Sequence, residues 1–266
     1  MQNAAFAAVG LDWSYELLGV EPERFDSVVR GMPGEGFVGA NVTIPHKLAA
    51  LEVADSATDV AQRVGAANTL LFADGRIEAD NTDVAGLEAS LAERAPGAPR
   101  GMRCLVLGAG GAGRAAVYAL LLGGAGSVTV WNRTPERAGE LVQSFRSEAA
   151  STELETAEKP DASTFDLILN ATSVGMARPG GDQAEEQGGD SFKALPVSAD
   201  ELRDGQMVVD LVYRPGGTRL ALAARERGLR CVDGFDVLVH QGAASFRRWT
   251  GREAPLEVMR RAARDP

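Results

Sequence analysis

A glycine-rich segment after an apolar strand constrains this chain more than any other feature. Residues 103–108 are predicted as a strand, 112–122 as a helix and 127–132 as a second strand, and the loop Gly108-Ala109-Gly110-Gly111-Ala112-Gly113 joins the first two. Glycines at G-x-G-x-x-G spacing permit a tight turn, close approach of the backbone to a pyrophosphate, and close packing of helix on strand. Because the flanking elements suit a βαβ unit, the loop predicts dinucleotide binding rather than a purely structural turn.

Alternating strands and helices continue on both sides of this unit. Downstream, helices are predicted at 135–145 and 219–228, and strands at 165–172, 206–213 and 230–234. This series is typical of a doubly wound, Rossmann-type α/β domain.

A second α/β series precedes the glycine loop. Strands are predicted at 13–20, 36–44 and 68–72, and helices at 23–32 and 46–65. The Pro- and Gly-rich residues 93–101 indicate a linker between the two series. We therefore expect an α/β chain with a first domain at 1–100, a nucleotide domain at 101–234, and C-terminal helices within 235–266 that could close either domain. The polar segments 146–164 and 177–193 are predicted to be solvated loops.

Composition excludes several classes of function. The net charge of −10 and the pI near 4.8 disfavour binding to nucleic acid, because basic side chains are not in excess. The apolar runs are too short and too interrupted for a membrane span, and the first residues do not resemble a signal peptide. Cys104 and Cys231 lie in strand-like runs typical of buried thiols. We expect a cytoplasmic protein without a metal, and either a monomer or a homodimer.

The end of the second strand of the βαβ unit indicates which dinucleotide binds. An acidic residue usually stands there and binds the NAD ribose, but this chain has Asn132-Arg133-Thr134, with Arg137 one turn later. Two guanidinium groups and a hydroxyl are suited to a 2′-phosphate, so NADP is favoured over NAD. The alternative is that Arg133 and Arg137 are ordinary solvated residues at a helix start.

Three polar patches in the first domain are candidates for chemistry. They are residues 41–47, 65–69 and 81–83, each close to an end of a predicted strand, where open α/β sheets bind ligands. Pro45 makes Lys47 an early helical residue. Lys47 beside Asp83 would give a proton donor with a partner that orients it, as reduction of a ketone requires, although the two could also form a surface ion pair.

Motifs along nearly the whole chain resemble the shikimate dehydrogenase family. They are NVTIPHK, GAANTL, NTD, GAGGAG, NRTPERA, NATSVGM, DLVY and DGFDVLVHQGA, in that order. The resemblance implies NADPH-dependent, reversible reduction of 3-dehydroshikimate to shikimate in aromatic amino acid (chorismate) biosynthesis. It also implies that the C-terminal helices return to the substrate domain.

The resemblance implies a role for particular residues. Lys47 and Asp83 would be catalytic. The substrate would be bound by Asn41, Thr43, Lys47, Asn68, Asp83, Tyr213 and Gln241. The cofactor would be bound by Gly108, Ala109, Gly110, Gly111, Ala112, Asn132, Arg133, Thr134, Arg137, Thr172, Ser173, Leu211 and Gly234.

The sequence departs from the family's pattern at its start. Family members normally have an additional strand and a Ser-x-Ser-Pro segment, whose serines bind the substrate carboxylate, before the equivalent of Met1. We expect a chain extended upstream to bind shikimate more tightly and to melt at a higher temperature. In addition, Asp59 stands where the family commonly has Glu near the cofactor.

Two other interpretations follow from the same residues. One is a quinate/shikimate dehydrogenase that uses NAD, which Asn132-Arg133-Thr134 argues against. Another is an NADP-binding protein that regulates or scaffolds without catalysis. His46, beside Lys47, is expected to cap or pack locally, and His240 to point to a different helix face from Gln241.

Overall fold

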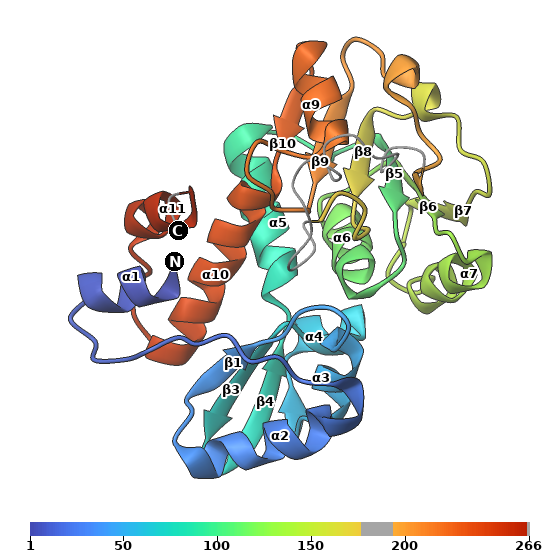
Figure 1. Cartoon of the computed structure of the whole chain (residues 1–266). Helices are drawn as coiled ribbons and strands as arrows, with labels where there is room; N and C mark the ends of the chain where they lie inside the picture. The colour runs from blue at the N-terminus through green and yellow to red at the C-terminus, as the bar shows by residue number, and fades with distance from the viewer. Residues whose placement is uncertain (177–193, 265–266) are drawn as a thin grey trace. The chain divides into compact units, whose positions relative to one another are not determined.

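The computed structural model describes residues 1–176 and 194–264 (Figure 1). Its contacts divide the chain into two compact units, Met1–Leu87 with Leu238–Pro266, and Glu88–Val237. The divisions fall inside two helices, α5 (Thr82–Arg94) and α10 (Gly234–Thr250). Both units combine helices with a sheet, which confirms the predicted α/β class. The limits predicted near residues 100 and 234 remain a prediction.

The second unit contains a six-stranded parallel sheet in the order β10-β9-β8-β5-β6-β7. Strand order runs outward in both directions from the centre, so right-handed crossovers place α6 and α7 on one face and α9 on the other. The strands are β5 (Arg103–Leu107), β6 (Ser127–Trp131), β7 (Glu153–Thr156), β8 (Leu167–Asn170), β9 (Met207–Asp210) and β10 (Arg230–Val232). The helices are α6 (Gly111–Leu122), α7 (Pro135–Ser144), α9 (Arg219–Glu226), and the short 3-10 turns η3 (Ala162–Thr164) and η5 (Ala199–Glu201).

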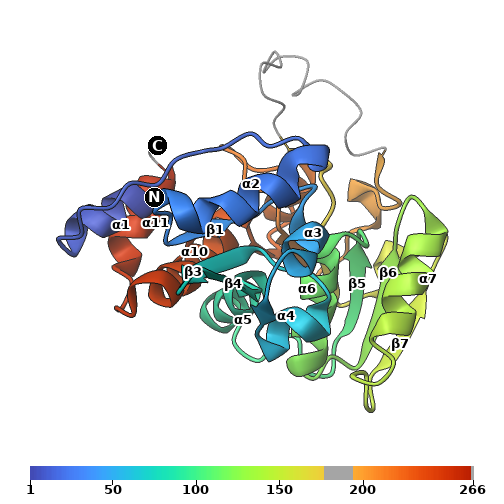
Figure 2. The ribbon, with the colours of Figure 1, turned by 90° about the horizontal axis from the view of Figure 1, so that it is seen from below.

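The first unit contains a four-stranded mixed sheet in the order β1-β3-β4-β2. Helices α2 and α3 lie beside this sheet (Figure 2), and their apolar residues pack with those of the strands in one buried cluster. The strands are β1 (Gly39–Asn41), β2 (Ser56–Ala57), β3 (Thr69–Ala73) and β4 (Arg76–Asp80). The helices are α1 (Gln2–Ala8), η1 (Pro22–Arg24), α2 (Phe25–Gly31), η2 (Met32–Glu35), α3 (Lys47–Glu52), α4 (Asp59–Val64) and α11 (Leu256–Arg264), beside the parts of α5 and α10 assigned to this unit.

The predicted strand at 13–20 is wrong, because this segment has no regular secondary structure and pairs with no strand of the described residues. Instead, the side chain of Asn3 forms hydrogen bonds with the backbone of Tyr15. Asn3 Oδ1 accepts from Tyr15 N at 2.6 Å, and Asn3 Nδ2 donates to Tyr15 O at 3.0 Å. A short polar side chain has here replaced the ladder partner that a strand would need.

The predicted helix at 46–65 is also wrong as one element, since α3, β2 and α4 divide it. The break falls at Asp55, whose carboxylate accepts from the N–H of Ile77 at 2.7 Å and joins the segment to β4. Thr58 then caps α4 by accepting from Ala61 N at 3.2 Å.

Three smaller differences concern loops and turns. Residues 153–156, predicted within a loop, form the mostly exposed edge strand β7, where charged side chains face solvent without cost. Residues 93–94 of the predicted linker belong to α5. The predicted loop at 177–193 lies outside the described residues. No helix in the described part of the chain is long and apolar enough to cross a membrane.

Candidate active site

One edge of the mixed sheet collects the three polar patches of the first unit. Strand β3 is antiparallel to both of its neighbours, so its amino end lies beside the carboxyl ends of β1 and β4. The register pairs Asn41 with Thr69, and Thr69 with Asp80. The patches therefore meet at one place, although the sequence pattern alone did not show that β3 runs against the other two strands.

A shielded ion pair forms the centre of this edge. Lys47, the first residue of α3, places its Nζ 2.6 Å from Oδ2 of Asp83, the second residue of α5. The two side chains are only 13% and 17% exposed, so the pair is shielded more than an ordinary surface ion pair. The Asp83 carboxylate accepts a further bond at Oδ1 from Asn68 Nδ2 at 2.9 Å, which fixes its orientation.

Asn68 connects this pair to the rest of the site. It is 3% exposed, and its Nδ2 also donates to Oε1 of Gln241 at 3.2 Å. Its Oδ1 accepts from the backbone N–H of Thr82 at 2.7 Å. Two residues predicted from different ends of the chain, Asn68 and Gln241, are thus brought into direct contact.

Behind these residues lies a buried cluster of three hydroxyl groups, two from the predicted polar patches and a third, from Ser245, that the sequence prediction missed. Oγ of Ser245 lies 2.9 Å from Oγ1 of Thr69 and 3.1 Å from Oγ1 of Thr82, and the two threonine hydroxyls lie 3.0 Å apart. Asn41 Nδ2 donates to Thr69 at 3.1 Å and to Ser245 at 2.9 Å. The spacing of Gln241 and Ser245 by four residues on α10 was the available signal, since such residues share a helix face.

The remaining atom of the Asn41 amide is also engaged. Its Oδ1 accepts from Tyr15 Oη at 3.2 Å, so Tyr15 is a second residue of this network that the prediction missed. Thr43 lies exposed in the turn before α3. Asp59 is exposed at the start of α4.

The two histidines differ in their surroundings. The His46 ring stacks on Phe25 with ring centroids 4.6 Å apart, and its Nε2 lies 2.8 Å from Val20 O. It therefore packs locally beside the segment before α2. His240 is half-buried on α10, next to Gln241.

The glycine loop of the second unit has the geometry that its spacing predicts. Gly108 has φ +109°, and a Cβ on Gly113 would lie 2.1 Å from Gly108 O, so only glycine permits this approach of α6 to the loop. Gly110 is the N-cap of α6, and a Cβ placed there would have no atom of the described residues within 4 Å. The loop backbone is therefore open to a ligand beside Gly110.

Asn132 couples this loop to the next strand. Its Oδ1 accepts from the backbone N–H of Ala109 at 3.1 Å, and its Nδ2 donates to Thr134 O at 2.9 Å. Arg133, Thr134 and Arg137 are exposed around the start of α7. Thus the residue that replaces the usual carboxylate orders the loop, and two cations stand beside it.

The other predicted cofactor residues lie on loops at the carboxyl edge of the same sheet. Thr172 and Ser173 follow β8, and Leu211 follows β9. Gly234 begins α10, and a Cβ there would lie 2.4 Å from the Val212 carbonyl oxygen. Tyr213, predicted to bind substrate, belongs to the β9 loop of this unit and is 50% exposed.

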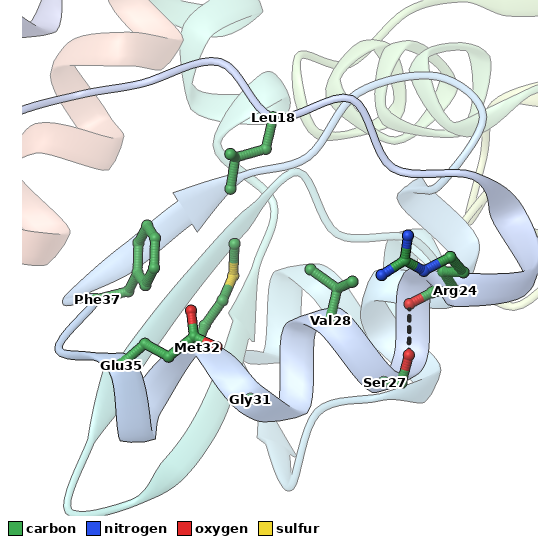
Figure 3. A pocket seen from close by; sticks show the side chains of 8 residues that line it. All are labelled: Leu18, Arg24, Ser27, Val28, Gly31, Met32, Glu35 and Phe37. Carbon is green, nitrogen blue, oxygen red and sulfur yellow. Dashed lines mark hydrogen bonds between the residues drawn. The ribbon is translucent and has the colours of Figure 1, made fainter.

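A separate hollow of about 390 Å³ lies in the first unit (Figure 3). Leu18 and Arg24 of η1 line it together with residues of α2 and η2, and the Arg24 carbonyl oxygen accepts from Ser27 Oγ at 2.9 Å. It contains none of the predicted site residues. Within residues 1–176 and 194–264, no group of three potential ligands could hold a metal ion.

The two cysteines are free thiols. Burial raises the pKa of the Cys104 thiol to about 12 and that of Cys231 to about 11. Both thiols are therefore protonated at neutral pH and are poor nucleophiles.

Comparison with known families covers both units. Residues 1–70 match the family described as shikimate dehydrogenase substrate binding domain, residues 90–185 match shikimate / quinate 5-dehydrogenase, and residues 234–264 match shikimate 5′-dehydrogenase C-terminal domain. A curated protein of Moorella thermoacetica, named shikimate dehydrogenase (NADP(+)), is 41% identical over 100% of this chain and 87% of its own length. The chain belongs to the shikimate dehydrogenase family.

Other members of the shikimate dehydrogenase family support this assignment. A protein of Ruegeria sp. with the same name is 43% identical over 96% of this chain and 87% of its own length. The crystal structure of shikimate 5-dehydrogenase from Thermus thermophilus, in complex with NADP(H) and shikimate, is 37% identical and has a TM-score of 0.83. That comparison covers 99% of this chain and 92% of the other, so the family predicted from the motifs is confirmed.

Proposed function

We propose that this protein is an NADP-dependent shikimate dehydrogenase that reversibly reduces 3-dehydroshikimate to shikimate. The observation that carries the proposal is the shielded Lys47–Asp83 pair, with Nζ and Oδ2 2.6 Å apart, in a chain that also has an open glycine loop followed by Arg133. The first supplies a proton donor, and the second suits a phosphorylated dinucleotide. The family assignment connects both features to one reaction.

Lys47 and Asp83 are the proposed catalytic residues. The Lys47 ammonium donates a proton to the substrate carbonyl oxygen as that oxygen gains negative charge, and the neutral amine regains its proton from solvent. Asp83 holds Nζ in place through its Oδ2 and is held in turn by Asn68. Asp83 is therefore proposed both to orient Lys47 and to accept a bond from a substrate hydroxyl.

The remaining proposed substrate contacts have different amounts of free hydrogen-bonding capacity. Asn41 and Asn68 use their amide nitrogens within the protein, so they act on the substrate mainly through the groups that they orient. Thr43 is exposed and available for a new bond. The full proposed set is Asn41, Thr43, Lys47, Asn68, Asp83, Tyr213 and Gln241.

The residues of the second unit fit NADP. Bound reduced nicotinamide supplies the hydride that the substrate carbonyl carbon accepts. The backbone at Gly110 has room for a pyrophosphate, and the first N–H groups of α6 are suited to bind it. Arg133, Thr134 and Arg137 are proposed to bind the 2′-phosphate, and no carboxylate occupies residues 132–134 to repel it. The other proposed contacts are Gly108, Ala109, Gly111, Ala112, Asn132, Thr172, Ser173, Leu211 and Gly234.

We further propose a cytoplasmic protein of aromatic amino acid biosynthesis. Its two cysteines are free, as is usual in a reducing compartment. Light scattering after size-exclusion chromatography distinguishes a monomer from a homodimer.

The test follows the absorbance of NADPH after 3-dehydroshikimate is added to the purified protein. We expect oxidation of NADPH, little oxidation of NADH, and little reaction with 3-dehydroquinate. Faster reaction with NADH and 3-dehydroquinate would identify a quinate-type enzyme instead. Unchanged absorbance with all pairs, together with tight NADPH binding, would identify a protein that binds the cofactor without catalysis.

A further inference from the structure

Two neighbouring strands of the parallel sheet end on a buried polar pair. Asn170 is the last residue of β8, Asp210 is the last residue of β9, and the register places them side by side. Each is only 1% exposed, and Asn170 Nδ2 donates to Asp210 Oδ1 at 3.1 Å. The pair lies where both chains leave the sheet for the carboxyl-edge loops.

Asp210 also binds the loop that follows its own strand. Its Oδ1 accepts from the backbone N–H of Val212 at 3.0 Å, and its Oδ2 accepts from the hydroxyl of Thr218. Thr218 caps α9 by accepting from Ala221 N at 3.1 Å. One carboxylate therefore fixes the beginning and the end of residues 211–218.

Asn170 fixes the other loop in the same way. Its Oδ1 accepts from the Thr172 backbone N–H at 3.1 Å and from the Thr172 hydroxyl at 2.7 Å. The same hydroxyl accepts from Val174 N at 3.0 Å, which shapes the loop up to Gly175. A Cβ on Gly175 would lie 3.0 Å from Cγ2 of Thr218, so the two loops pack against each other.

The burial of the Asp210 carboxylate lowers the stability of the fold, so stability alone does not explain its presence. Its pKa is raised to about 6: burial is the main cause and the Asp233 carboxylate adds to it, while its hydrogen bonds act in the opposite direction. Arg225 pairs with Asp233 at 2.7 Å, and no ion pair among the described residues includes Asp210. An unpaired buried carboxylate is expensive to retain, and such groups concentrate at functional sites.

We propose that Asp210 is a positioning residue that, with Asn170 and Thr218, holds residues 171–175 after β8 and residues 211–218 after β9 in the shape that receives the nicotinamide end of NADP. This inference rests on the proposed cofactor. It extends the proposed site to three residues that do not themselves contact the reacting atoms. Thr172, Ser173 and Leu211 lie on the two loops, whereas the glycine loop and Arg133 lie on other connections of the sheet.

The test compares two ligands: NADPH, and 2′-phospho-ADP-ribose, which has the same phosphates but no nicotinamide. Calorimetry with Asp210→Ala should show at least about tenfold weaker binding of NADPH, the scale for losing a buried charged acceptor, and binding of 2′-phospho-ADP-ribose within about twofold of wild type. Asp210→Asn keeps the shape and an acceptor oxygen, so it should restore most NADPH affinity. The fluorescence of bound NADPH, which reports on the nicotinamide, should change in Asp210→Ala and be largely restored in Asp210→Asn.

A second pair of variants provides the same test if Asp210→Ala does not fold. Thr218→Val keeps the side-chain shape and removes the hydroxyl, and Thr218→Ser is its matched control. Thr218→Val should weaken the binding of NADPH several-fold, on the scale of one hydrogen bond, and leave the binding of 2′-phospho-ADP-ribose unchanged. Thr218→Ser should bind NADPH as the wild type does. Equally weakened binding of both ligands, or unchanged binding of both, would overturn the proposal.

The same data separate this inference from the proposed function. A wild-type protein that binds NADPH but does not oxidise it with 3-dehydroshikimate removes the function and leaves the positioning role measurable. A wild-type protein that binds neither ligand overturns both.

Discussion

The two units build their parts of the candidate site from different materials. In the first unit, polar side chains form the site: Lys47, Asp83 and Asn68 are joined by bonds of 2.6 and 2.9 Å above a cluster of buried hydroxyls. In the second unit, the absence of side chains matters most, because Gly113 lies against Gly108 and the backbone at Gly110 is open. Removal of one polar group should therefore impair the function of the site in the first unit. Addition of one methyl group should impair cofactor binding in the second unit.

Lys47→Ala gives the largest expected effect. Turnover of 3-dehydroshikimate should fall by at least about 100-fold, the usual scale for a positioned general acid, while the Kd for NADPH stays unchanged. Steady-state kinetics and calorimetry on the same preparation measure both. Lys159→Ala, which removes an exposed lysine of the second unit, is the matched control. Near-normal turnover of Lys47→Ala would remove this residue from the mechanism.

Arg133→Ala tests the side-chain recognition proposed for the 2′-phosphate of the cofactor. The loss of a charge-assisted bond to phosphate should weaken NADP binding by about 10- to 100-fold and NAD binding far less. Binding of both dinucleotides is measured by calorimetry, with Arg146→Ala as an exposed control. An equal loss for both dinucleotides would mean that Arg133 contacts a part that they share or supports the fold.

Gly110→Ala tests the role of the open backbone. No atom of the residues that the structure describes lies within 4 Å of the added Cβ, and φ −83° suits alanine, so the melting temperature should not fall. NADPH binding should weaken by about tenfold or more, because the methyl group occupies the approach of the pyrophosphate. Gly139→Ala, also without neighbours, is the control. Unchanged affinity would show that the cofactor does not approach this backbone.

Thr82→Val tests the hydroxyl cluster, and its effect should be the smallest. The substitution keeps the side-chain shape but leaves Ser245 and Thr69 without one partner, so kcat/KM should fall by about three- to tenfold. Thr82→Ser retains the hydroxyl and should be near wild type. If both variants reduce activity equally, shape rather than hydrogen bonding at this position is important.

The sequence predicted the second unit better than the first for a physical reason. Strands β5, β6, β8 and β9 are buried on both faces, so each appears as an apolar run that periodicity detects, and the glycine spacing marks the first turn. In this unit β7 was missed, since its exposed Glu and Thr residues resemble a loop.

The first unit has short elements whose ends depend on individual side chains. The Asn3–Tyr15 bonds replace a strand, and Asp55 and Thr58 divide a helix, none of which periodicity can detect. Strand β4 was not predicted, although Asp74-Gly75, with φ of 52° and 70°, is a typical hairpin turn that could have indicated it.

The candidate site followed the same pattern. Lys47, Asn68 and Asp83 could be chosen from the polar patches and from the family motifs that contain them. For Ser245 the only local signal was its helical spacing from Gln241, and for Tyr15 there was none, because their contacts with Asn41 join residues 204 and 26 positions apart in the chain. Such contacts depend on tertiary packing rather than on local sequence.

Transfer of isotope from cofactor to product tests the central claim most directly. The wild-type protein is given 3-dehydroshikimate and NADPH that carries deuterium at both hydrogen positions of the reactive nicotinamide carbon, and the product is analysed by mass spectrometry and NMR. The account predicts shikimate with one deuterium on the carbon that bears the new hydroxyl, formed in proportion to the NADPH consumed. Unlabelled shikimate, or consumption of NADPH without shikimate, would contradict it.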